Sequence, residues 1–128
     1  MKAEAKRIPK EGHGLPDIEI KVVEEGAILG EYFLAHYQPW NGWKGEKGSH
    51  HYGGKIMHSY RSNSHIPRLM MEKAVSEMQQ IADSINLPIV HVMSLETLHS
   101  AKMDGLCRDC NYESKGGYFQ RVFMPKTF

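Results

Sequence analysis

The stretch YRSNSHIPRLMMEKA, residues 60–74, is the most informative part of the sequence. It joins a short predicted strand, residues 55–60, to a long predicted helix, residues 67–85, whose apolar side chains recur at helical spacing. Pro67 suits the first turn of a helix, where a missing N–H costs little. A loop that enters a helix directly after a strand favours a bound anion, because free backbone N–H groups and the helix dipole point there.

Strands are predicted on both sides of this helix. The β-rich run IVHVM, residues 89–93, follows it, and strand, helix and strand at this spacing predict a right-handed crossover between parallel strands. Upstream, residues 17–24 alternate apolar and polar side chains, and the turn Glu25-Gly26 leads into a returning strand at residues 27–37. These two segments predict an antiparallel hairpin.

The rest of the chain predicts one more helix, one more hairpin and an irregular arm. Residues 96–108 have helical spacing, and Lys115-Gly116-Gly117 is a strong hairpin turn before the last β-rich run. Residues 1–16 contain two prolines and two glycines and predict an irregular N-terminal arm. The expected organisation is therefore this arm and one α/β domain, residues 17–128, with a mixed twisted sheet, two flanking helices and a C-terminal β-hairpin.

Composition predicts a soluble protein of one domain. The chain has 128 residues, 41% of them hydrophobic, with a net charge of +1. This charge does not indicate binding to nucleic acid or to a membrane surface, and no apolar run is long enough to span a bilayer. The basic start of the chain is followed by no apolar stretch, so it is not a secretory signal. We expect a cytoplasmic location.

Cys107 and Cys110 form a single C-x-x-C pair. The pair lies late in a predicted helix and not at a helix start, where redox cysteines have a lowered pKa. A zinc site that combined them with His99 would need a fourth ligand, and the adjacent His50 and His51 have no partner at metal-ligand spacing. The favoured interpretation is two reduced thiols and no metal site.

The loop at residues 39–54 contains five glycines, with Trp40 and Trp43 among polar residues. A connection of this length inside a compact domain tends to be functional or held by a partner. Two interpretations stay open: the two tryptophans anchor the loop on the core, or they form a surface for a substrate or a protein partner.

The order of these elements resembles that of the GNAT family of N-acetyltransferases over residues 17–123. Two local matches support the resemblance: PRLMMEKA, residues 67–74, is similar to the helix opening after the family's pyrophosphate loop, and LCRDCNYE, residues 106–113, is similar to a later helix end and the following strand. The final run GYFQRVF, residues 117–123, fits the last strand of the family.

The resemblance implies acetyl-CoA as the cofactor and a small or protein amine as the substrate. The residues that would bind the cofactor are Arg61, Ser62, Asn63, Ser64, His65, Ile66 and Arg68. Asn63, His65 and Pro67 stand where the family has glycines that let the backbone approach the pyrophosphate, and Arg61 is a candidate phosphate clamp. Cys107 aligns with the tyrosine that often protonates the departing thiolate.

An amine that attacks a thioester must lose a proton, and a histidine is the natural base near neutral pH. His58 is the first candidate because it lies on the strand that would border the thioester, and His51 and Glu31 follow it. The predicted catalytic residues are therefore His58 as the base and Cys107 as the acid.

A second hypothesis is a GNAT-like scaffold that has lost its chemistry and works by binding. Such a protein would be structural or would interact with a host, as in a phage virion, and would use the Trp40/Trp43 loop for a partner or for self-assembly. The replaced glycines and Cys107 favour this alternative, whereas the strand-loop-helix arrangement and Arg61 favour the enzyme.

Overall fold

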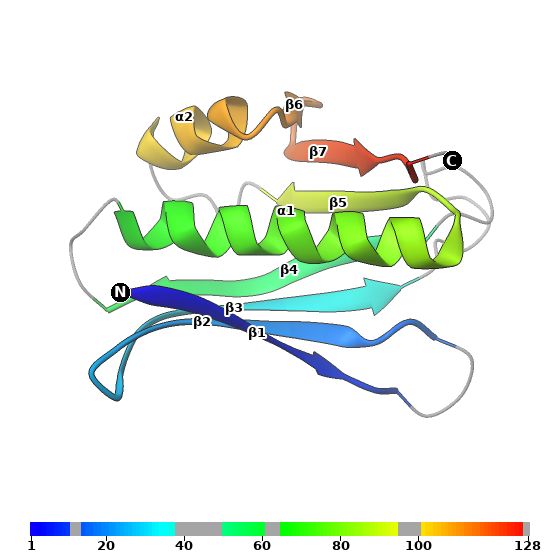
Figure 1. Cartoon of the computed structure of the whole chain (residues 1–128). Coiled ribbons are helices and arrows are strands. Elements are labelled where there is room, and N and C mark those ends of the chain that lie inside the picture. The colour runs from blue at the N-terminus through cyan, green and yellow to red at the C-terminus, as the bar shows by residue number, and fades with distance from the viewer. Residues whose placement is uncertain (11–13, 38–49, 61–64, 95–100, 127–128) are drawn as a thin grey trace.

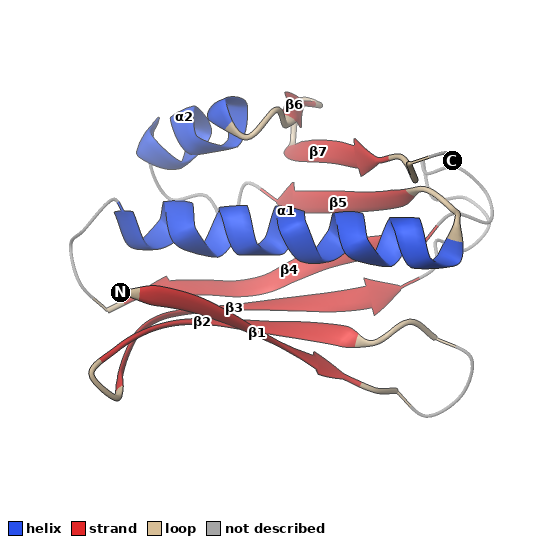
Figure 2. Cartoon of the chain, in the orientation of Figure 1, coloured by secondary structure: helices blue, strands red, loops and turns tan. Residues whose placement is uncertain are grey.

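The computed structural model describes residues 1–10, 14–37, 50–60, 65–94 and 101–126 (Figure 1). Its elements are β1 Lys2–Ile8, β2 Asp17–Glu24, β3 Ala27–Tyr37, β4 His50–Ser59, α1 His65–Ile85, β5 Ile89–Ser94, α2 Ala101–Asp109, β6 Glu113–Ser114 and β7 Tyr118–Phe123. Figure 2 shows one layer of strands with α1 lying across it.

The described strands form one mixed sheet in the order β1-β2-β3-β4-β5-β7-β6. β4 and β5 are parallel, and each of the other neighbouring pairs is antiparallel. The predicted α/β class is therefore confirmed, together with the β2–β3 hairpin, the crossover through α1 and the β6–β7 hairpin. Parallel strands need a long connection, and the 21-residue helix α1 supplies it.

The prediction of an irregular arm at residues 1–16 is wrong for its first half. β1 pairs with β2 along its whole length, from Lys2 opposite Val23 to Ile8 opposite Asp17. The apolar pattern of β1 is weak because only the small side chains of Ala3 and Ala5 pack against the core. The remaining positions are mostly charged, which suits an edge strand, because exposed charges discourage pairing with other chains.

The predicted strand at residues 55–60 is also too short. β4 begins at His50, and His51 to Gly54 are paired with β3, so the end of the predicted glycine-rich loop belongs to the sheet. Glycine is rare in strands, and for that reason the adjacent Gly53 and Gly54 predicted a loop. Trp40 and Trp43 lie outside the described residues.

Both helices pack on the same face of the sheet. On α1 the buried side chains form one stripe: Ile66, Met70, Met71, Ala74, Glu77, Met78, Ile81 and Ala82. A β-carbon added to Gly30 on β3 would lie 2.7 Å from Ile66, so β3 and α1 are in close contact. α2 covers the β5–β7 side of this face, where Cys107 contacts Met93 and Arg108 lies over the ring of Phe119.

Candidate functional site

The two parallel strands stop pairing in the middle of the sheet. β4 and β5 pair from His50 opposite Ile89 to Gly53 opposite Val92. β4 then continues to Ser59 alongside β3 alone. We call the place just beyond the Gly53–Val92 pair the divergence point. In open α/β sheets, ligands bind near the carboxyl ends of parallel strands, so a ligand site is expected here.

A buried tyrosine crosses β4 at the divergence point. The ring of Tyr32, on β3, lies over Gly54, and its hydroxyl oxygen is 2.9 Å from Nε2 of His91 on β5. A β-carbon at position 54 would collide with the Tyr32 hydroxyl. The glycine is therefore needed at this place because a side chain from one neighbouring strand passes over it to reach the other.

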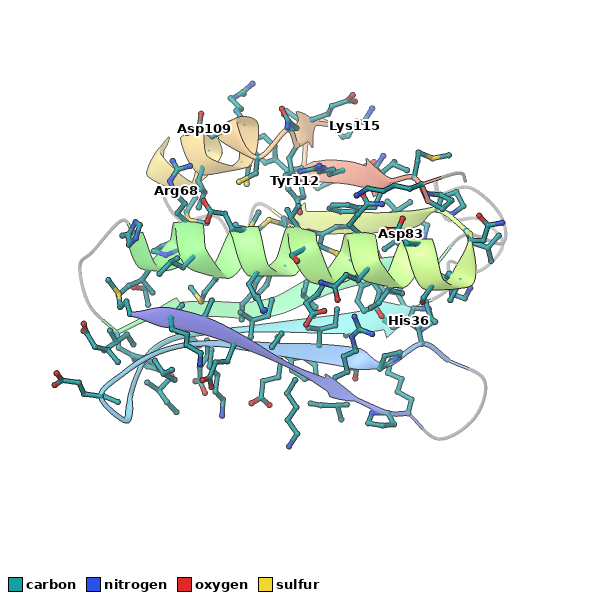
Figure 3. All side chains as sticks on the ribbon, viewed as in Figure 1. His36, Arg68, Asp83, Asp109, Tyr112 and Lys115 are labelled. Atoms are coloured by element: carbon teal, nitrogen blue, oxygen red, sulfur yellow. The ribbon has the colours of Figure 1, made fainter. Side chains whose placement is uncertain are left out.

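A second tyrosine completes a three-residue chain of hydrogen bonds. The hydroxyl oxygen of Tyr112 is 2.5 Å from Nδ1 of His91. Tyr112 follows α2, and Figure 3 shows it just beyond the end of that helix. The turn that aims it depends on Asn111, whose φ of 64° is left-handed, while the Tyr112 N–H donates to the Cys107 carbonyl at 2.9 Å.

Burial keeps all three members of this Tyr32–His91–Tyr112 chain neutral. Tyr32 and His91 have no exposed surface. Desolvation lowers the pKa of His91 to about 3 and raises the pKa of both Tyr32 and Tyr112 far above the ordinary tyrosine value. The sequence analysis missed this chain; the one available signal was a histidine inside the apolar run at residues 89–93.

Cys107 lies close to the same place, and its thiol is buried and protonated near neutral pH. It is fully buried, its Sγ is 3.9 Å from Sδ of Met93, and desolvation raises its pKa to about 11. Cys110 is half-buried, and desolvation raises its pKa as well. Among the residues that the structure describes, no group of three or more His, Cys, Asp or Glu side chains could hold a metal. His99 lies outside them.

Two of the predicted bases lie together. His58 and Glu31 are directly opposite each other on β4 and β3. The Tyr60 hydroxyl donates to Oε2 of Glu31 at 2.6 Å, and the His58 ring stacks on Tyr60 with centroids 6.3 Å apart. His58 is exposed, so it is accessible to a substrate. His51 is seven residues earlier on β4, buried, with its ring 5.5 Å from that of Tyr37.

The structure describes only part of the predicted cofactor-binding segment. Residues 61–64, and with them Arg61, Ser62, Asn63 and Ser64, lie outside the described residues. His65 is exposed at the start of α1, and Ile66 is buried in the core. Arg68 forms an ion pair with Asp109, at 3.1 Å, where α1 begins and α2 ends (Figure 3). Of this set, the structure therefore ties Arg68 to α2 and gives Ile66 a packing role.

Two histidines lie together at the start of β4. Nε2 of His36 is 2.8 Å from Nδ1 of His50. The Lys10 ammonium donates to the His36 carbonyl oxygen at 2.6 Å and pairs with Asp17 at 3.0 Å. Burial and the neighbouring His50 and Lys10 lower the pKa of His36 to about 4. Sequence analysis did not single out His36, because its partners come from three separate segments.

The chain matches no protein-family model, no curated protein and no solved structure. In the part of the chain that the structure describes, no helix is both long and apolar enough to cross a membrane.

Proposed function

We propose that this protein is an acetyl-CoA-dependent N-acetyltransferase of the GNAT type, acting on a small or protein amine. The observation that carries the proposal is the parallel pair β4–β5, which separates in mid-sheet and has the long helix α1 between its two strands in the chain. The order of the elements along the chain supports it, because a hairpin, a strand, a long helix, a strand, a second helix and a final hairpin follow the element order of that family.

The start of α1 suits the pyrophosphate of the cofactor. The first turn of α1 contains no acidic side chain, and the free N–H groups of a helix start attract an anion. Arg61, four residues before the helix, would supply a bidentate clamp. The ion pair with Asp109 holds Arg68 near the start of α1. Arg68 adds positive charge there, and the Asp109 carboxylate partly cancels its effect.

His58 would act as the base that takes the amine proton, directly or through water. The imidazole is exposed, and Glu31 lies opposite it on the same face of the sheet. Cys107 is a poor acid for the departing thiolate. A thiol with a pKa of about 11 gives its proton to a thiolate of ordinary pKa, about 8.5, only against about 3 kcal/mol. The thiolate would therefore take its proton from water or leave as an anion.

The test is calorimetric titration of the protein with acetyl-CoA. Binding at micromolar or tighter affinity is expected, and Arg61→Ala should weaken it about tenfold or more, because a charge-assisted bond to phosphate is lost. Lys6→Ala, a loss of one exposed positive charge on β1, is the matched control and should leave the affinity unchanged. An absence of both heat and thermal shift in the wild-type protein would contradict the proposal.

The alternative, a binding scaffold without chemistry, is favoured by the inert thiol of Cys107 and by Asn63, His65 and Pro67 in place of glycines. It predicts no acetyl-CoA binding. It also predicts that Trp40→Ala with Trp43→Ala abolishes partner capture or self-association while the far-UV spectrum is unchanged. Association that survives both substitutions would argue against it.

A further inference from the structure

The two hydrogen bonds of His91 require its single proton to lie on one of the two ring nitrogens. A neutral imidazole has one N–H and one bare nitrogen, so it donates one hydrogen bond and accepts the other. With an oxygen acceptor, bonds from a hydroxyl donor are typically near 2.7 Å and bonds from an N–H donor near 2.9 Å. The 2.5 Å bond at Nδ1 fits donation by Tyr112, and the 2.9 Å bond at Nε2 fits donation by His91 to Tyr32.

With this arrangement one proton is left over. The Tyr112 proton is used in the bond to Nδ1, and the His91 proton is used in the bond to Tyr32. The Tyr32 oxygen accepts and still carries its own proton. Among the described residues, His91 is the one hydrogen-bond partner of the Tyr32 hydroxyl. This O–H is a fully buried donor, and an unsatisfied buried donor is costly, so an acceptor is expected there.

The position of the Tyr32 hydroxyl indicates where this acceptor would lie. It lies over Gly54, immediately beyond the last paired residues of β4 and β5. The hydroxyl therefore lies where the two strands separate. The hydroxyl is neutral and shielded from water, so it donates a hydrogen bond without giving up its proton, and water does not compete for that bond.

We propose that the Tyr32 hydroxyl donates a hydrogen bond to the carbonyl oxygen of an acyl thioester bound at the divergence point. The inference rests on the proposed acetyl-CoA function and adds a residue to it. When an amine attacks the carbonyl carbon, negative charge develops on this oxygen, and a fixed donor in a water-free site stabilises that charge. His91 and Tyr112 are positioning residues, because they hold the Tyr32 oxygen and set the direction of its proton.

One measurement needs no ligand. Nitrogen-15 NMR of labelled histidine in the intact protein distinguishes a protonated Nε2 from a protonated Nδ1. For His91 we expect the proton on Nε2. A proton on Nδ1 would leave the spare hydroxyl proton on Tyr112 and would overturn the assignment to Tyr32.

The second measurement uses acetyl-CoA labelled with carbon-13 at the thioester carbonyl, observed by difference infrared spectroscopy. In the wild-type complex the carbonyl stretch should lie below its value in a non-bonding environment, and Tyr32→Phe should raise it and weaken binding about two- to tenfold. Tyr52→Phe is the matched control: it removes a hydroxyl on the same face that donates to the Pro16 carbonyl at 2.7 Å. It should change neither quantity.

The outcomes separate the two proposals. Binding by the wild-type protein with the same carbonyl stretch in Tyr32→Phe would overturn the Tyr32 assignment and leave the proposed function in place. No binding by the wild-type protein would remove both. Should Tyr32→Phe fail to fold, 3-fluorotyrosine at position 32 replaces it: a more acidic hydroxyl should lower the carbonyl stretch further, and an unchanged stretch would again overturn the assignment.

Discussion

Tyr32 reaches across strand β4 to His91, and its hydroxyl lies 2.9 Å from Nε2 of that histidine. The two residues are 59 positions apart in the chain and come from strands that do not pair with each other. Gly54 makes the crossing possible, because it leaves the surface of β4 bare beneath the tyrosine ring. This contact joins β3 to β5 over the point where β4 and β5 separate.

Gly54→Ala should destabilise the protein by about 1–3 kcal/mol, because the added methyl group collides with the Tyr32 hydroxyl and ring. Urea unfolding followed by circular dichroism measures the change. Gly105→Ala is the control: nothing lies within 4 Å of a β-carbon there, and alanine favours helix α2. Equal stability of Gly54→Ala and wild type would show that Tyr32 does not pack over position 54.

Acid should destabilise the fold through buried histidines. The pKa of His91 is about 3 and that of His36 about 4, both below the ordinary 6.5 of an unfolded chain. The unfolded state therefore binds these protons first, so the stability present above pH 6.5 is lost as the pH falls toward 4 and 3. For His91 alone the loss between pH 7 and pH 5 is about 2 kcal/mol.

Urea unfolding of His91→Gln at several pH values tests this contribution. The variant should be less stable at pH 7, and its stability should fall less between pH 7 and pH 5 than that of the wild type. His58→Gln removes an exposed imidazole and should leave the pH dependence unchanged. Parallel curves for wild type and His91→Gln would contradict a neutral, buried His91.

The ion pair between Arg7 and Glu77 ties the edge strand to α1. Arg7 Nη2 lies 2.9 Å from Glu77 Oε2, and the glutamate side chain is only 12% exposed. Arg7→Met should cost about 1–3 kcal/mol, because it leaves a largely buried carboxylate unpaired. Lys2→Met, which breaks an exposed pair on the same strand, should change stability by less than about 0.5 kcal/mol.

A double variant makes the Arg7 test sharper. Glu77→Met added to Arg7→Met should recover most of the lost stability, because the unpaired charge disappears. Chemical unfolding of the four proteins in this cycle gives the coupling between the two side chains. A coupling near zero would show that this ion pair does not help to hold β1 against α1.

Asn111 should tolerate glycine but not a β-branched residue. Its φ of 64° lies in the left-handed region, where Asn111→Val is expected to cost about 1–2 kcal/mol and Asn111→Gly little or nothing. Thermal unfolding measures both. Glu113→Val, at an exposed position two residues later, is the control. If valine were tolerated at position 111, the turn that aims Tyr112 at His91 would not need this backbone conformation.

Local periodicity was enough to predict several elements with accurate bounds. Alternation at every second residue defined the β2–β3 hairpin at residues 17–24 and 27–37, and helical spacing defined α1 to within two residues. Both signals come from one face of an element being buried, and that information lies within ten to twenty consecutive residues. The parallel β4–β5 pair followed from the length of the connection alone.

Other features depended on partners distant in the chain. β1 has little apolar pattern and exists as a strand because β2 pairs with it. The glycine pair 53–54 suggested a loop, but within the sheet Gly54 makes room for Tyr32, and a side chain at Gly53 would press on Tyr37. The contact between His36 and His50 likewise forms only when β3 and β4 align.

Short-range signals in the sequence were therefore sufficient for the β2–β3 hairpin, for α1 and for the order of the later elements, since burial periodicity and turn chemistry act over short distances. Which polar side chains meet depends instead on how segments distant in the chain pack together. The Tyr32–His91–Tyr112 chain arises from strand register, from a missing β-carbon at Gly54 and from a left-handed turn at Asn111. Each of these acts between segments that no local pattern connects, and together they place a buried hydroxyl where β4 and β5 separate.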